Sequence, residues 1–142
     1  MKFVKSTIYW VPFILYMALI FYLSSIPQPP MPMSDVWNID KVYHLIEYSI
    51  FSLLAFYAFV HAPFKIISEN AILLAILFTA FFGATDEIHQ LYVEGRQSNI
   101  TDWLFDTAGG FLGVFCALLL RRLYQSWIFS RESDVKKKDR NI

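Results

Sequence analysis

Residues 71–92 have the sequence AILLAILFTAFFGATDEIHQLY, an apolar stretch that ends in a group of ionisable side chains. An α-helix needs about 20 residues to cross the hydrocarbon core of a bilayer, and this stretch has that length. Asp86, Glu87 and His89 lie inside it, and ionisable residues within a membrane segment are costly and usually functional. The stretch therefore predicts a membrane-spanning helix with a site near one of its ends.

The composition of the whole chain also indicates a membrane protein. Of its 142 residues, 56% are hydrophobic and 18% are aromatic, and its mean hydropathy is +0.44. These values are unusual for a soluble domain of this size. Three more apolar stretches of spanning length occupy residues 8–25, 41–60 and 100–120. We expect an all-α integral membrane helical bundle, with four transmembrane helices in one domain over residues 1–142.

Helix-breaking residues separate the four stretches. Residues 26–38 contain four prolines, which favour an extended loop: Pro27, Pro29, Pro30 and Pro32. Further breaks are expected at Pro63 and at Gly95. The first stretch follows two lysines, as a signal peptide would, but it is long, aromatic and without a small-x-small cleavage site. We interpret it as a retained membrane span.

The distribution of Lys and Arg predicts the orientation, because cytoplasmic loops of membrane proteins are enriched in these residues. Of the twelve cations, only Lys41 and Arg96 fall on the side opposite the N-terminus. We therefore expect a multi-pass protein of the cytoplasmic membrane with both termini in the cytoplasm and its polar residues at the outer face. The basic tail, residues 131–142, is expected to be disordered and attracted to anionic lipid headgroups. Nothing in this pattern indicates a nucleic-acid partner.

Helical spacing places the polar residues of three spans on shared faces. The three sets are Asp40, His44 and Glu47, then Asp86, His89 and Gln90, and finally Asp102, Asp106, Gly109 and Gly113. The two glycines of the last set form a small-xxx-small pair, which allows a neighbouring helix to approach closely. We expect the three faces to meet in one polar pocket that opens toward the outer leaflet.

Charge limits what this pocket can be. Six acids, at positions 40, 47, 86, 87, 102 and 106, face the two cations Lys41 and Arg96 and the two histidines His44 and His89. Burial and like charge both oppose the ionisation of carboxylates. Some of the acids must therefore be protonated, solvated, paired with imidazolium, or bound to a metal ion or to a cationic group of a substrate.

Three sequence blocks resemble the VanZ-like family over residues 40–120. They are Asp40-Lys41-x-x-His44-x-x-Glu47-Tyr48, then Asp86-Glu87-x-His89-Gln90 followed by Gly95-Arg96, and Asp102-x-x-x-Asp106-x-x-Gly109-Gly110-x-x-Gly113. The resemblance implies a small bacterial cell-membrane protein, and the founding member is linked to resistance to the lipidated glycopeptide teicoplanin. It implies no established reaction, and it does not transfer the resistance phenotype. Family members commonly carry Asn at the position of Asp106, so this chain adds an acid there.

The first hypothesis is a site that binds, or acts on, a lipid-anchored cell-envelope molecule. The catalytic candidates are His44, Glu47, Asp86, His89 and Asp106, and the substrate-binding candidates are Asp40, Lys41, Tyr48, Glu87, Gln90, Arg96 and Asp102. In the enzymatic version a histidine acts as general base, oriented by Glu47 or Asp86, and Lys41 and Arg96 hold an anionic group. The sequence leaves open whether the protein is an enzyme.

A divalent metal site is a related alternative. Asp86-x-x-His89 has the carboxylate-x-x-His spacing of metal centres in helical bundles, and His44 and Glu47 are available from a neighbouring helix. Carboxylate and imidazole ligands suit zinc, manganese or iron.

Two further hypotheses belong to other classes of protein. In one, the polar residues form a non-catalytic interhelical lock, and the protein is a membrane partner, a modulator or a small transporter component. The sequence leaves open whether a protein partner or a homo-oligomer is involved. In the other, the acids and histidines serve proton-coupled transport. The latter is disfavoured for a monomer, because the ionisable groups gather at one end of the spans and only His61 lies along a path to the inner face.

Overall fold

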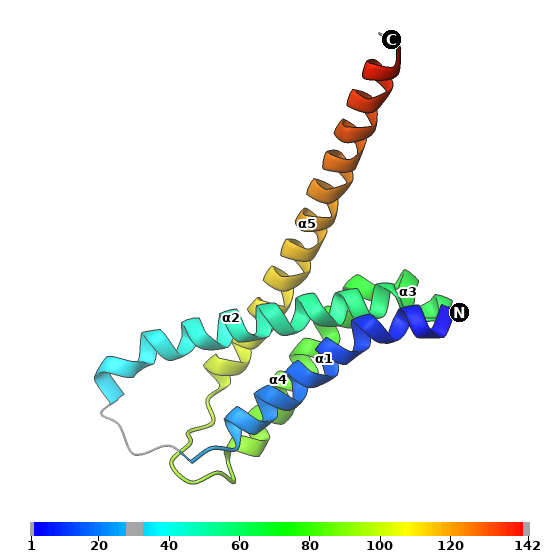
Figure 1. Cartoon of the computed structure of the whole chain (residues 1–142). Coiled ribbons are helices and arrows are strands. Elements are labelled where there is room, and N and C mark those ends of the chain that lie inside the picture. The colour runs from blue at the N-terminus through cyan, green and yellow to red at the C-terminus, as the bar shows by residue number, and fades with distance from the viewer. Residues whose placement is uncertain (1, 28–32, 141–142) are drawn as a thin grey trace.

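The protein consists of helices throughout the part of the chain that the structure, a computed structural model, describes (Figure 1). This part comprises the backbone of residues 2–27 and 33–140 and the side chains of residues 6–27 and 39–131. The helices are α1 (Lys2–Ser24), α2 (Met33–Val60), α3 (Lys65–Glu69), α4 (Ala71–Gln90) and α5 (Ile100–Arg140). Four of them, all except α3, are long and apolar enough to cross a membrane. The prediction of an all-α protein with four spans is confirmed.

Several helix ends differ from the expected ones. Helix α2 begins at Met33, earlier than the predicted 41, because the last proline of the loop precedes it and nothing later interrupts the helix. The three prolines of the loop at positions 29, 30 and 32 lie outside the described residues. The break at Gly95 is confirmed, since this residue adopts a positive φ of 78° that favours glycine. The short helix α3 was not predicted.

Helix α5 extends far beyond the predicted end at residue 120. It continues to Arg140, so the prediction of a disordered tail was wrong. Residues 121–140 contain neither proline nor glycine, and without such a breaker a helix continues readily. The part of α5 beyond the other helices projects away from them (Figure 1), and its described side chains up to Arg131 are largely exposed.

Helix α2 is the centre of the packing, because it contacts α1, α3, α4 and α5. Phenylalanines join α1, α2 and α4 in the interior. The ring of Phe51 on α2 lies 5.3 Å from that of Phe13 on α1 and 4.8 Å from that of Phe82 on α4. Phe13 also contacts Phe78 at 5.7 Å. Large buried aromatic side chains dominate the energetics of such a core, so this group fixes the three helices relative to one another.

Helices α2 and α5 approach each other closely at glycines of α5. A Cβ atom added at Gly109 would lie 2.7 Å from the carbonyl oxygen of Leu45, and one added at Gly113 would meet the carbonyl oxygen of Ser49. Ser52 adds a hydrogen bond across the same interface, donated from Oγ to the carbonyl of Gly110 at 2.8 Å. The predicted small-xxx-small contact is therefore confirmed.

The bundle has two different ends. At one end, Ser6 of α1 donates a hydrogen bond to the carbonyl of His61 at 2.8 Å, and the ring of Tyr9 stacks on that of His61 at 3.7 Å. At the other end, the last turns of α1 and α4 lie near each other (Figure 1), and Lys41 of α2 contacts Asp102 in the first turn of α5. The acids of the three sequence blocks lie at this second end.

Candidate functional site

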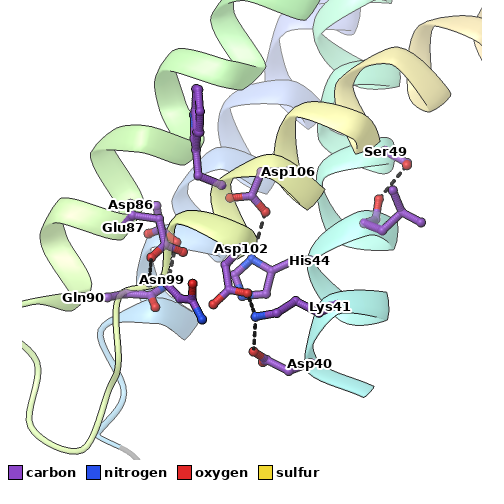
Figure 2. Close-up of polar contacts among 12 residues, drawn as sticks. Asp40, Lys41, His44, Ser49, Asp86, Glu87, Gln90, Asn99, Asp102 and Asp106 are labelled. Carbon is purple, nitrogen blue, oxygen red and sulfur yellow. Dashed lines mark hydrogen bonds and ion pairs between the residues drawn. The ribbon is translucent and has the colours of Figure 1, made fainter. Parts of the chain in front are cut away.

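A buried group of ionisable and polar side chains occupies the second end of the bundle (Figure 2). We call it the polar cluster. It consists of Asp40, Lys41 and His44 from α2, Asp86, Glu87 and Gln90 from α4, and Asp102 and Asp106 from α5. The structure thus brings together eight of the twelve residues that the sequence put forward as site candidates.

An ion pair joins α2 to the first turn of α5. The Nζ atom of Lys41 contacts Oδ1 of Asp102, and it lies 3.6 Å from Oδ2 of Asp40. Lys41 and Asp102 are only 5% and 4% exposed, respectively, whereas the side chain of Asp40 is 42% exposed. The pair of Lys41 and Asp102 is therefore buried between α2 and α5, and Asp40 lies beside it at the exposed edge of the polar cluster.

One turn deeper, His44 and Asp106 form a second link between α2 and α5. Nδ1 of His44 lies 2.8 Å from Oδ1 of Asp106 (Figure 2). Asp106 is fully buried, and the side chain of His44 is 12% exposed. Gly83 of α4 makes room for the carboxylate, because a Cβ atom added there would lie 2.9 Å from Oδ2 of Asp106.

Helix α4 contributes a second pair of carboxylates. Nε2 of Gln90 donates a hydrogen bond to Oδ2 of Asp86 at 2.9 Å. Oε2 of Glu87 accepts a hydrogen bond from the backbone N–H of Asn99 at 2.8 Å, which fastens the loop before α5 to α4. Asp86, Glu87 and Gln90 are all buried.

Several buried oxygen atoms in and beside the polar cluster have no hydrogen-bond partner among the described residues. They include Oδ1 of Asp86, Oε1 of Glu87, Oδ2 of Asp106 and the hydroxyl of Tyr48. Buried polar atoms without a partner are rare in native proteins and call for an explanation, such as a bound proton, water or ion. The polar cluster therefore has capacity to bind something more than its own side chains.

The remaining candidates lie around the polar cluster. Glu47 is half-buried and lies one helical turn from His44 on α2. The buried Tyr48 lies one turn below His44, and their rings are nearly parallel with centroids 6.4 Å apart.

His89 and Arg96 contact the end of α1 instead. Nε2 of His89 lies 2.9 Å from Oγ of Ser25, and the imidazole stacks on the ring of Phe21 at 4.4 Å. Arg96 donates hydrogen bonds to the carbonyls of Leu23 at 2.6 Å and Ile26 at 3.3 Å. Helix C-termini leave such carbonyls without intrahelical partners, so Arg96 caps α1.

Two groups of side chains could hold a metal ion in the described part of the chain. They are Asp40, His44 and Asp102, and His44, Glu87 and Asp106, and in each group the candidate ligand atoms lie within 4.8 Å of one another. Both differ from the set predicted from the Asp86-x-x-His89 spacing. That spacing puts both residues on one face of α4, but the ring of His89 turns toward α1.

The sequence interpretation missed Gly83 and Asn99. Asn99 immediately precedes α5, and its Oδ1 accepts a hydrogen bond from the N–H of Thr101 at 3.0 Å. Asparagine is a preferred residue at this position of a helix, which was the available signal. Gly83 lies one helical turn before Glu87, but a single glycine in a span does not reveal which neighbour it accommodates.

The comparison with known families confirms the predicted resemblance to the VanZ-like family. The family model described as VanZ/LLP1 matches residues 2–121. The chain belongs to the VanZ/LLP1 family. All residues of the polar cluster fall inside the matched range, whereas the last part of α5 lies outside it. No curated protein and no solved structure matches the chain significantly.

Proposed function

We propose that this VanZ/LLP1 protein binds the headgroup of a lipid-anchored cell-envelope molecule at its polar cluster, from the outer leaflet of the cytoplasmic membrane. The observation that supports this most strongly is the burial of Asp86, Asp102 and Asp106, each at most 4% exposed, at the same end of two neighbouring spans. Acids buried within membrane spans are costly, and they usually mark a functional site.

The polar cluster becomes more accessible toward the end of the spans. The side chain of Asp106 is 1% exposed, that of His44 12% and that of Asp40 42%. A polar headgroup therefore enters past Asp40 and meets His44 before Asp106, while the lipid chain stays among the apolar side chains on the outside of the bundle.

The enzymatic form of this proposal assigns the proton transfer to His44. An imidazole that is oriented through Nδ1 by a carboxylate can exchange a proton through its other nitrogen, as general acid–base catalysis requires. Asp106 holds His44 in that way at 2.8 Å. Asp106 rather than Glu47 or Asp86 thus becomes the orienting acid.

The competing candidate is a non-catalytic interhelical lock, and the buried pair of Lys41 and Asp102 favours it. A lock is stable when its polar atoms satisfy one another. The free oxygens of Asp86, Glu87 and Asp106 do not fit this description. For this reason we favour a ligand site that is built around a structural ion pair.

Native mass spectrometry of the detergent-purified protein tests the proposal. We expect a specific lipid or lipid-linked precursor to copurify with the wild type and to be lost from the double variant Glu47→Gln, Asp86→Asn. Glu69→Gln is the matched control, because Glu69 is an exposed acid on α3 at the opposite end of the bundle. Identical lipid profiles in all three proteins would contradict the proposal and support the interhelical lock.

The connection to glycopeptide resistance can be tested with the same proteins in cells. If the bound molecule is the target of a lipidated glycopeptide, expression of the wild type and of Glu69→Gln raises the inhibitory concentration of teicoplanin, and the double variant does not. Equal inhibitory concentrations in all strains would separate lipid binding from resistance.

A further inference from the structure

We propose that His44, Glu87 and Asp106 form a site for one divalent transition-metal ion. The three residues come from α2, α4 and α5, and their candidate ligand atoms lie within 4.8 Å of one another. The proposal concerns the same polar cluster as the proposed function, but metal binding can be measured whether or not a lipid binds.

The free oxygens distinguish this group from a simple cluster of acids. Oδ2 of Asp106 and Oε1 of Glu87 are buried without a hydrogen-bond partner among the described residues, and the two residues are 0% and 6% exposed. Each carboxylate uses its other oxygen in a fixed contact, Asp106 with His44 and Glu87 with the N–H of Asn99. The side chains are thus oriented by protein contacts, while one oxygen of each remains available to a ligand.

The second candidate group, Asp40, His44 and Asp102, is a weaker site. The ammonium of Lys41 already contacts Asp102 and lies 3.6 Å from Asp40. A metal ion there would have to compete with a buried cation for the same carboxylates. The ammonium and the metal ion would then serve two neighbouring groups of acids, and each positive charge would stabilise its own pair.

Chemistry and charge favour a transition metal over an alkaline-earth ion. One imidazole with two carboxylates is a typical ligand set for zinc, manganese or iron, whereas magnesium and calcium prefer oxygen ligands alone. Metal–ligand distances of about 2.0–2.2 Å require the three groups to draw together from their present separation.

A bound cation would also explain how a site made largely of carboxylates can bind the headgroup of an envelope lipid. Phosphate or carboxylate headgroups are repelled by a cluster of carboxylates but are attracted to a metal ion held by them. The ion would supply this positive charge and polarise a bound oxygen. With the ion bound, His44 would be a ligand and would no longer serve as the general base. The positive charge for the headgroup then need not come from Arg96, which caps α1 in this structure.

The test is metal uptake by the purified protein. The protein is isolated in detergent with an affinity tag that lacks histidine, stripped with EDTA, and dialysed separately against ZnCl2 and MnCl2 before elemental mass spectrometry. We expect about one ion per chain for at least one of the two metals. Uptake should fall about tenfold or more in Glu87→Gln, Asp106→Asn, which removes two ligands and keeps their shapes.

Asp40→Asn is the matched control, because it removes an acid of the competing group and leaves His44, Glu87 and Asp106 intact. Uptake should match the wild type in this variant. Circular dichroism shows whether each variant is folded, and bound metal should raise the thermal unfolding temperature of the wild type and of Asp40→Asn only.

Two results would overturn the proposal. Absence of stoichiometric uptake by the wild type would mean that the free oxygens carry protons or water instead. Loss of uptake in Asp40→Asn, with binding retained in Glu87→Gln, Asp106→Asn, would place the metal in the other group. Neither result affects the lipid measurement described above, so the two proposals can fail separately.

Discussion

Lys41 places a positive charge between the α2 and α5 helices, where it is 5% exposed and contacts Asp102. Removing one partner of a buried ion pair leaves the other charge without compensation, which costs about 3–5 kcal/mol. We therefore expect Lys41→Met to lower the free energy of unfolding by about that amount. Equilibrium unfolding in mixed detergent micelles, followed by circular dichroism, measures the change.

The double variant Lys41→Met, Asp102→Leu is the decisive comparison for this ion pair. It replaces both charges by apolar side chains, and such a replacement is often neutral or stabilising. The double variant should therefore recover most of the stability that the single variant loses. A larger loss in the double variant than in Lys41→Met would show that Lys41 and Asp102 contribute separately rather than as a pair.

At the scale of residues, the sequence predicted which side chains gather at one end of the bundle better than it predicted their partners. The i, i+4 spacing on α2 and on α5 indicated correctly that Asp40 and His44, and likewise Asp102 and Asp106, share a face. Spacing within one helix carries no information about the rotation of its neighbours. The pairing of His44 with Asp106 and the turn of His89 toward α1 depend on that rotation, so only the structure revealed them.

At the scale of elements, hydropathy and breakers located the helices because each span must satisfy its own backbone in the membrane. Pro63 and Gly95 marked two of the breaks correctly. The start of α2 and the end of α5 were missed, since polar residues continue both helices beyond the apolar stretches. Hydropathy reports where a helix meets lipid, whereas the helix itself ends only where a breaker or a cap ends it.

The contact between α2 and α5 gives a prediction about a whole interface. A Cβ atom at Gly113 would meet backbone atoms of α2, namely the carbonyl oxygen of Ser49 and, at 3.0 Å, the nitrogen of Leu53. Backbone atoms in a helix cannot change position by rotation as a side chain can, so Gly113→Ala should push α2 and α5 apart. Overpacking of this kind costs about 1–3 kcal/mol, measured as a loss of unfolding free energy in detergent.

Gly110→Ala is the control for this substitution, because it adds the same methyl group to the same helix. Its Cβ atom would lie 3.2 Å from the side chain of Thr79, and the nearest backbone atom, the carbonyl oxygen of Ile76, would be 3.9 Å away. A side chain can adjust, so the loss should be clearly smaller than in Gly113→Ala. A larger loss in Gly110→Ala would contradict the close approach of α2 and α5 at Gly113.

At the scale of the whole molecule, charge and length together favour one orientation in the membrane. With its 41 residues and a rise of about 1.5 Å per residue, α5 is on the order of 60 Å long and exceeds a hydrocarbon core of about 30 Å. The lysines and arginines of α5 all follow residue 120. We therefore expect the projecting part of α5 on the cytoplasmic side, where loops are rich in Lys and Arg, and the polar cluster at the outer face.

Cysteine labelling in intact cells tests this orientation. Cys116 is the only cysteine, so Cys116→Ala provides a background for Gln97→Cys, at an exposed position of the loop between α4 and α5, and for Glu69→Cys, in α3 at the opposite end. A membrane-impermeant maleimide should label Gln97→Cys in intact cells and Glu69→Cys only after permeabilisation. The reverse pattern would show that the protein has the opposite orientation in the membrane, with the polar cluster at the cytoplasmic face. A headgroup in the outer leaflet could then not reach Asp40, and the lipid-binding proposal would have to move to a molecule of the inner leaflet.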